Sequence, residues 1–151
     1  MQIVDYRPDL ATAFRTLNEA WITQLFTLEA KDVETLADPG ARIIAPGGKI
    51  VFVVDGGDAV GCCALMAMAD GGFEVAKMAV ADSHKGRGLG RLLMAACIER
   101  ARAAGAKRLY LETNSGLAPA LGLYRSFGFA VIEPAEPSPY ARADVAMELW
   151  L

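Results

Sequence analysis

The chain has 151 residues, of which 54% are hydrophobic and 22% are charged, and its formal net charge is −3. This length and composition predict one folded domain, residues 1–151, with a sizeable hydrophobic core. The small acidic charge argues against nucleic acid or an anionic membrane surface as a partner. The longest apolar run, residues 59–69, is too short to span a bilayer, and residues 1–10 lack the basic and apolar segments of a secretory signal. We therefore expect a cytoplasmic protein that binds neither nucleic acid nor membrane.

Cysteine and histidine are too few to suggest a disulfide framework or a metal centre. The three cysteines are Cys62, Cys63 and Cys97, an odd number that includes an adjacent pair. This arrangement fits neither a set of disulfides nor a C-x-x-C motif. The only histidine is His84, and a zinc site needs a cluster of ligands. We therefore expect no metal, and we expect the paired cysteines to lie in the core.

The predicted elements form a mixed α/β fold around one central sheet. In chain order, we expect strands at residues 2–6, 50–54, 59–69, 73–81, 107–113, 129–132 and 142–150, and helices at residues 10–26, 31–37, 89–104 and 119–128. Turns rich in Asp and Gly separate the second, third and fourth strands, so these three are predicted to form an antiparallel meander. In the helix at 89–104, Leu89, Leu92, Leu93, Ala96 and Cys97 form one apolar face.

The segment at residues 85–90, Lys-Gly-Arg-Gly-Leu-Gly, is the most informative stretch of the chain. It follows a predicted strand and opens a predicted helix. Its glycines allow backbone N–H groups to approach a ligand closely, and the helix start supplies unpaired donors with a partial positive charge. The segment therefore predicts a phosphate site, although glycines before a helix can also serve only as a tight turn.

Two common nucleotide motifs fit this segment poorly. A Walker A loop is excluded, because the chain has no Gly-Lys-Ser or Gly-Lys-Thr. The fingerprint G-x-G-x-x-G fails in both registers, since its third glycine is replaced by Arg91 or by Leu93. Glu112 ends the next strand at about the distance expected for a ribose contact. A dinucleotide-binding oxidoreductase therefore remains an alternative.

Residues 75–129 resemble the GNAT superfamily of acyl-CoA-dependent N-acetyltransferases. The family signature [QR]-x-x-G-x-[GA] corresponds to residues 85–90, with Lys85 where Gln or Arg is usual. The substitution is mild, because the backbone of this loop does the binding. Two other segments match at the right spacing: the strand at 77–80, and Asn114 followed by residues 123–129. The resemblance implies a GNAT-like fold, with a mostly antiparallel sheet splayed at the cofactor site and helices on both faces.

The resemblance also implies an acetyl-CoA site. The amides of residues 87–91 would bind the diphosphate, and the backbone of residues 78–80 would bind the pantetheine opposite Asn114. An amide at 78 or 80 would polarise the thioester carbonyl. The implied cofactor-binding residues are Met78, Ala79, Val80, Lys85, Gly86, Arg87, Gly88, Leu89, Gly90, Arg91, Asn114, Tyr124 and Arg125.

Two residues are candidates for proton transfer. Tyr124 matches the family's usual general acid for the departing thiolate, although it could also only pack against the cofactor. Glu74 resembles a carboxylate base found in part of the family, and strand alternation predicts that it shares a face with Met78 and Val80. The alternative for Glu74 is a solvated residue beside a turn. His84 is expected to hydrogen-bond the loop rather than act as a base.

The acceptor is expected to be a primary amine of a small molecule that enters between the first helices and the last hairpin. The candidate substrate-binding residues there are Trp21, Glu29 and Tyr140, together with Asp32 and Arg142. The carboxylates favour a cationic acceptor and Arg142 an acidic one, so the acceptor's charge stays open. A non-catalytic acyl-CoA-binding module of the same fold is the alternative function. Exposed strand edges and the apolar residues 149–151 suggest a homodimer.

Overall fold

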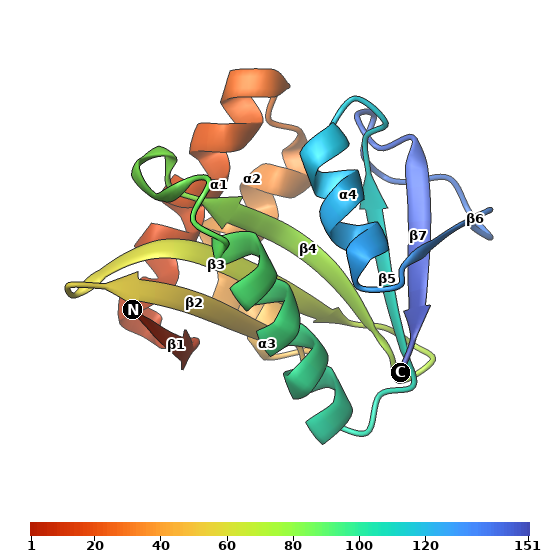
Figure 1. Cartoon of the computed structure of the whole chain (residues 1–151), viewed down its shortest axis with the longest axis horizontal. Helices are drawn as coiled ribbons and strands as arrows, with labels where there is room; N and C mark the ends of the chain where they lie inside the picture. The colour runs from red at the N-terminus through yellow and green to blue at the C-terminus, as the bar shows by residue number, and fades with distance from the viewer.

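The computed structural model describes residues 1–151 as a seven-stranded sheet with four α-helices (Figure 1). In chain order the elements are β1 (Gln2–Asp5), α1 (Ala11–Leu25), α2 (Ala30–Ala37), β2 (Lys49–Asp55), β3 (Asp58–Ala67), β4 (Phe73–Val80), α3 (Leu89–Ala103), β5 (Arg108–Thr113), α4 (Ala118–Ser126), β6 (Ala130–Ile132) and β7 (Val145–Trp150). The strand order is β1-β2-β3-β4-β5-β7-β6. The predicted mixed α/β class is confirmed.

The sheet is antiparallel except at its centre. β2, β3 and β4 form the predicted antiparallel meander, and β5, β7 and β6 form a second antiparallel group. The two groups meet where β4 and β5 run parallel, and they pair there at only two positions, Phe73 with Leu109 and Glu74 with Tyr110. Beyond Glu74 the two strands separate. The sheet is therefore splayed in its middle, as the resemblance implied.

Helices cover both faces of the sheet (Figure 1). α3 and α4 pack on one face over a core of 20 buried residues, which includes Leu93, Cys97 and Leu121. α1 and α2 pack on the other face over nine buried residues, which include Phe14 and Leu36. Both faces of the central strands are thus covered, which explains why β2 and β3 are apolar throughout, apart from the charged residues at their ends.

Most predicted bounds agree with the structure, and four details differ. A 3₁₀ turn, Pro8–Leu10, precedes α1, and a π-helical turn that was not predicted covers Gly40–Ile44. Leu92 was predicted on the apolar face of α3, but it is 44% exposed because it lies at the margin of that face. β7 begins later than predicted because residues 141–142 form a turn, and the carboxylate of Asp144 then accepts hydrogen bonds from the N–H and hydroxyl of Ser115.

The surface leaves several earlier predictions open. No helix combines the length and the apolar character needed to cross a bilayer. Val131 and Trp150, on β6 and β7, are large apolar side chains that are more than half exposed. Val131 lies on the edge strand β6, and Trp150 belongs to the apolar residues 149–151 that suggested a homodimer; the homodimer stays a prediction. Cys62 and Cys63 are fully buried in the core, as predicted.

Candidate active site

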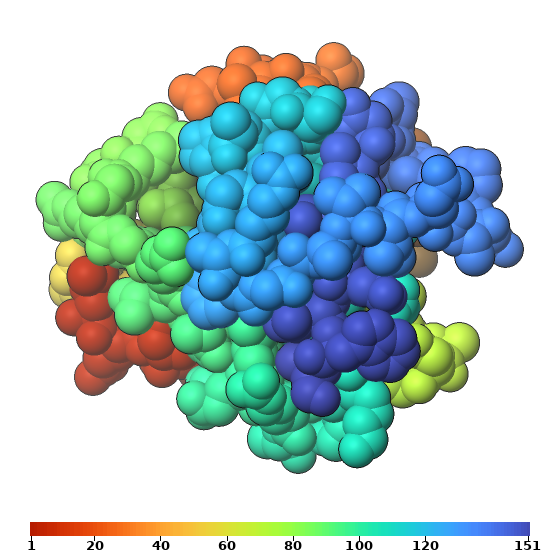
Figure 2. Space-filling view, turned by 45° about the vertical axis from the view of Figure 1, so that its right-hand side comes forward, coloured from red at the N-terminus to blue at the C-terminus, as the bar shows by residue number.

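A cavity of about 320 Å³ opens where β4 separates from β5. The loop before α3 and helix α4 stand on either side of a hollow in the surface at this place (Figure 2). The cavity is lined by Trp21, Leu25, Phe26, Glu74, Val75, Ala76, Lys77, Met78, Ala79, Val80, Lys85, Glu112, Thr113, Asn114, Leu117, Pro119, Ala120, Leu123, Tyr124, Tyr140, Arg142 and Ala143. Most of the residues predicted for catalysis and acceptor binding therefore meet in one chamber.

The glycine loop has the geometry of an anion site. Gly86 and Gly88 have φ angles of +77° and +80°, which side chains rarely tolerate. Gly88 is the N-cap of α3, and no side chain caps the first N–H groups of this helix. A Cβ added to either glycine would meet no protein atom within 4 Å, so the space above the loop is open. Free amides, a helix start and open space together fit a phosphate group.

The third glycine of the motif has a different role. A Cβ on Gly90 would lie 3.2 Å from Leu123 Cδ2, so this glycine permits α3 and α4 to pack closely. The cationic side chains nearby are scattered. Lys85 lines the cavity and pairs with Asp82 at 2.8 Å, and Arg91 lies over the ring of Phe127. The features that fit an anion therefore come from the backbone of the loop rather than from a cluster of side-chain charges.

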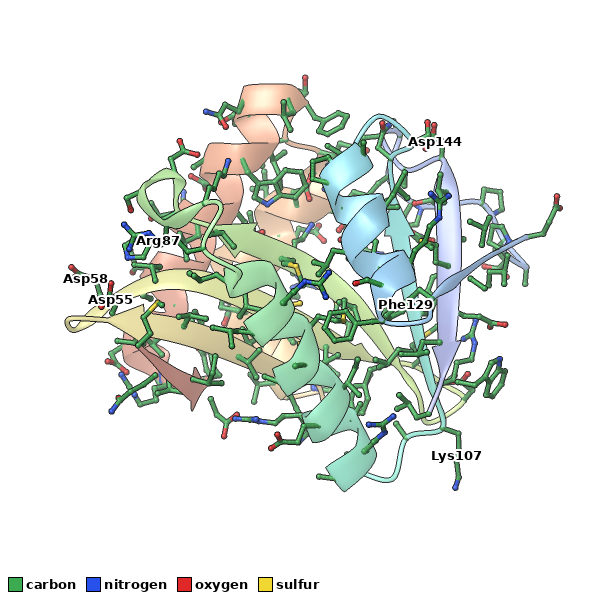
Figure 3. All side chains as sticks on the ribbon, in the orientation of Figure 1. Asp55, Asp58, Arg87, Lys107, Phe129 and Asp144 are labelled. Atoms are coloured by element: carbon green, nitrogen blue, oxygen red, sulfur yellow. The ribbon has the colours of Figure 1, made fainter.

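The loop is held against the hairpin between β2 and β3. His84 Nε2 lies 2.8 Å from Asp55 Oδ2, and His84 Nδ1 lies 2.7 Å from Ser83 Oγ. The hydrogen bond with His84 lowers the pKa of Asp55 from its ordinary value. Arg87 lies near Asp55 and Asp58 at the tip of this hairpin (Figure 3). His84 was predicted to hydrogen-bond the glycine loop, but its ring bonds Ser83 and Asp55 instead, so it holds the segment just before the loop against this hairpin.

β4 contains a bulge at Lys77. The register between β3 and β4 shifts between Cys62, which faces Ala79, and Ala64, which faces Ala76. Lys77 has a φ of +55° and is the only non-glycine residue with a positive φ. A residue in this conformation interrupts the alternation of side chains along a strand. The residues before and after Lys77 therefore follow different alternation patterns.

Because of the bulge, Glu74 lies on the opposite face of the sheet from the one that was predicted. Met78 and Val80 pack against the same core as Phe73, on the side of α3, whereas Ala79 packs in the core under α1 and α2. Glu74 alternates with Phe73 and therefore points to the side of α1 and α2. The prediction that Glu74 shares a face with Met78 and Val80 was wrong, because strict alternation does not continue through the bulge.

Glu74 has the environment of a group that titrates near neutrality. It lines the cavity and is mostly buried, and no hydrogen bond to its carboxyl is found. Burial and the charge of Glu112 raise its pKa to about 7. Glu112 itself is restrained, because its two carboxylate oxygens accept hydrogen bonds from the hydroxyls of Tyr110, at 2.8 Å, and Ser138, at 2.6 Å. Glu74 is thus the free carboxyl of the pair.

Tyr124 lies on α4 and lines the cavity from the opposite side. Its ring packs edge-on against Phe129, with the ring centroids 6.1 Å apart. Burial raises the pKa of Tyr124 above its ordinary value, and the nearby Cys63 thiol adds to this effect. The phenol is therefore neutral at physiological pH and is a hydrogen-bond donor. Arg125, the next residue, is exposed.

The side of the cavity that was predicted to bind the acceptor is built on one buried carboxylate, Asp32. Lys77 Nζ forms a short ion pair with it, and Arg142 binds it through two hydrogen bonds of 2.7 Å. Burial alone would raise the pKa of Asp32, but the hydrogen bonds from Arg142 and Lys77 outweigh this and hold the pKa well below its ordinary value. Tyr140 completes the group, since its hydroxyl accepts a hydrogen bond of 3.2 Å from Lys77. We call Asp32, Lys77, Tyr140 and Arg142 the Asp32 cluster.

Two other predicted residues, Glu29 and Asn114, hold the segment that carries Tyr140 and Arg142. Glu29 does not line the cavity; it is the N-cap of α2, and its carboxylate accepts hydrogen bonds from the N–H of Ala141 and from Arg142. Asn114 lines the cavity, but its side chain donates to the carbonyl of Arg142 at 2.6 Å and accepts from the N–H of Gly116. Both residues hold the segment before β7 in place.

A family model for the Acetyltransferase (GNAT) family matches residues 10–129. The chain belongs to this family. A relative named IAA acetyltransferase, from Azospirillum brasilense, is 36% identical over 107 residues, which cover 70% of this chain and 65% of that protein. The chain thus spans less than two thirds of this relative's length.

Solved structures show the same GNAT fold. A GNAT-family acetyltransferase from Staphylococcus aureus superposes with a TM-score of 0.88 at 15% identity, over 99% of this chain and 98% of that one. The yncA protein of Salmonella typhimurium, whose structure contains its cofactor acetyl-CoA, superposes with a TM-score of 0.78 at 22% identity, over 99% and 93% of the two chains. At these identities the likeness shows the fold alone.

Sequence reasoning missed three features of this GNAT site. Lys77 was treated only as part of an apolar strand, and the role of Asp32 as a buried hub was not foreseen. Glu112 was considered only for a ribose contact. One signal was available, because a lysine within an otherwise apolar strand requires a buried partner.

No group of three or more His, Cys, Asp or Glu side chains is arranged to hold a metal ion.

Proposed function

We propose that this protein is an acetyl-CoA-dependent N-acetyltransferase that transfers an acetyl group directly to the primary amine of a small molecule. The observation that carries the proposal is that one cavity holds a free carboxyl, Glu74, and a neutral phenol, Tyr124, beside a loop with free amides. The acetyl-CoA held by the Salmonella fold neighbour and the name of the Azospirillum relative support it.

The cofactor is proposed to lie between the two separated strands. The amides at the start of α3 suit its diphosphate, because they have no capping side chain. From Val75 onward, β4 has no strand partner on the side of β5. Its backbone N–H and C=O groups there are free to pair with the two amides of the pantetheine arm, as a further strand would. Asn114 lines the other side.

The chemistry needs one base and one acid. The ammonium form of the acceptor gives a proton to the carboxylate of Glu74, directly or through water. The freed amine nitrogen attacks the thioester carbonyl carbon, the C–N bond forms, and the C–S bond breaks with its electron pair on sulfur. Tyr124 donates its hydroxyl proton to the departing thiolate, and the proton lost by the new amide nitrogen returns to the Tyr124 oxygen. The net products are an amide, free CoA and one proton.

The residues suit these roles at neutral pH. A general base must be ionised at the working pH, and it must also be basic enough to take a proton from the ammonium. A pKa of about 7 meets both needs. The raised pKa of Tyr124 keeps the phenol protonated until a thiolate forms beside it. A free thiol has an ordinary pKa of about 8.5, so a thiolate is a weaker base than a tyrosinate. Tyr124 therefore stabilises the thiolate first by a strong hydrogen bond, and proton transfer to sulfur is completed as the new amide nitrogen gives its proton to the phenol oxygen.

Titration calorimetry with acetyl-CoA, CoA and NAD tests the proposal. We expect both CoA species to bind with one molecule per chain and NAD to give no heat. Binding of NAD without binding of CoA would overturn the proposal in favour of a dinucleotide-binding protein. Binding of acetyl-CoA without thiol release in the presence of any amine would leave a non-catalytic acyl-CoA-binding module.

A further inference from the structure

On the acceptor side of the cavity, the negative and the positive groups differ in how many of their hydrogen-bonding positions are still free. The Asp32 carboxylate is fully used within the protein, whereas several hydrogen-bond donors around it are not. Asp32 is 0% exposed, and its oxygens accept from Lys77, from Arg142 twice, and from the backbone N–H of Glu29. A carboxylate offers about four acceptor sites, so Asp32 has none left for a ligand. Asp32 is therefore unavailable to a cationic acceptor, and Glu29, the other carboxylate predicted there, does not line the cavity.

The donors of the same cluster exceed their partners. The ammonium of Lys77 has three N–H donors and uses two, on Asp32 and on the Tyr140 oxygen. The Tyr140 hydroxyl accepts that bond, and no partner for its own proton is found. Arg142 has five N–H donors and uses three. All three side chains line the cavity. This wall therefore presents spare donors on two cationic side chains and one phenol, and no spare carboxylate oxygen.

A carboxyl that can attract a cationic group lies a short distance along β4 from these donors. Glu74 precedes Lys77 by three residues and, because of the bulge, points to the same side of the sheet. Its carboxyl has no hydrogen-bond partner, and the carboxylate of Glu112 lies close enough to affect it. A cationic amine is therefore favoured beside Glu74. Between and around these two ends, Trp21, Leu25 and Phe26 add apolar surface to the lining.

We propose that the acceptor is an apolar α-amino acid or a close analogue, whose amine lies beside Glu74 and whose carboxylate is bound by Lys77, Tyr140 and Arg142. This inference rests on the proposed function and names the substrate class of the same site. The acceptor enters as a zwitterion, so both of its charges meet an opposite charge in the cavity. Its side chain packs against Trp21 and its apolar neighbours.

Matched acceptors test the role of the carboxylate. L-phenylalanine, L-phenylalaninamide and 2-phenylethylamine share an amine and an apolar group, but only the first has a carboxylate. L-leucine and L-methionine can each be compared in the same way with their amide and with the amine that lacks the carboxylate. Thiol release from acetyl-CoA would be measured for each. We expect kcat/KM for the free amino acid to exceed that for its amide by at least about tenfold, as expected for a hydrogen-bonded charge. Chemistry alone favours the amide, whose ammonium loses its proton more readily.

A pair of variants distinguishes the loss of carboxylate binding from a general loss of activity. Tyr140→Phe removes one spare donor, and we expect it to reduce the preference for the acid over the amide by about tenfold. Tyr6→Phe removes a hydroxyl outside the cavity and is expected to leave the preference unchanged. Equal or faster turnover of the amides, or an unchanged preference in Tyr140→Phe, would overturn the inference while leaving the proposed function intact.

A binding measurement keeps the two proposals distinguishable. If acetyl-CoA binds but no amine is acetylated, the proposed catalytic function fails. Calorimetric titration of L-phenylalanine, L-leucine and L-methionine into the CoA-loaded protein then decides the inference on its own. Binding of the acids but not of their amides supports a carboxylate site. Absence of binding by all three acids, or equal binding of the amides, overturns it.

Discussion

Replacing Glu74 by glutamine is expected to stabilise the protein at alkaline pH while removing most of its activity. Burial favours the neutral carboxyl, so the folded state keeps this proton up to about pH 7, whereas an ordinary glutamate releases it near pH 4.5. The folded state therefore binds more protons between these values, and the free energy of unfolding decreases as the pH rises through them. Glutamine is neutral at every pH and avoids this loss.

The size of the effect follows from the difference in pKa. The values 4.5 and about 7 differ by about 2.5, and at 1.36 kcal/mol for each pKa unit this corresponds to about 3.4 kcal/mol. Glu74 is partly exposed at the cavity wall, and solvent screens its charge. We therefore expect Glu74→Gln to raise the free energy of unfolding by about 2 kcal/mol at pH 9 and by almost nothing at pH 4.

Two assays test this prediction. Urea unfolding at pH 4 and at pH 9 measures the stability difference, with exposed Glu136→Gln as the matched control. Steady-state kinetics should show that wild-type kcat/KM rises as the pH rises through about 7, because the base must be ionised. Glu74→Gln should lower kcat by about 10²–10⁴-fold and lose this rise. The reasoning is refuted if the variant is no more stable than the wild type at pH 9, or if it keeps the wild-type pH profile.

Three further variants test other parts of the site. Gly88→Glu should abolish acetyl-CoA binding in calorimetry but leave a cooperative thermal transition, because its side chain enters open space above the loop at a backbone angle strained for any side chain; normal binding by the folded variant would contradict the loop assignment. Tyr124→Phe should lower kcat by about tenfold or more with little change in the Kd of acetyl-CoA, and an unchanged kcat would leave the phenol a packing role only. Asp32→Ala should lower the free energy of unfolding by about 3–5 kcal/mol in urea, because Lys77 and Arg142 lose the buried charge that they share; a loss below about 1 kcal/mol would contradict the role of Asp32 as a hub.

The features that sequence analysis predicted well are those fixed by local chemistry. Gly86 and Gly88 adopt positive φ angles before a helix, as a glycine-rich segment at that place requires. The meander from β2 to β4 follows from apolar runs that are separated by turns rich in Asp and Gly. The family resemblance then supplied what local chemistry cannot, namely the separation of β4 from β5.

The features that it missed depend on contacts between distant segments. The bulge at Lys77 is a matter of pairing with β3, and the ammonium is held by Asp32, 45 residues earlier in the chain. Arg142 reaches the same carboxylate across 110 residues. Sequence alone therefore left the acceptor's charge open, because it could not show that Asp32 is consumed by two cations. It also placed Glu74 on the wrong face, since a straight strand is the default expectation.

The most direct test of the account is to follow the acetyl group itself. The protein would be incubated with acetyl-CoA labelled with ¹³C in the acetyl group and with L-phenylalanine, and the carbonyl signal would be followed by NMR while free thiol is measured. The account predicts one N-acetyl amide for each thiol released, with no thiol released when the amine is omitted. Release of labelled acetate in place of an amide, or thiol release that does not depend on any amine, would contradict it.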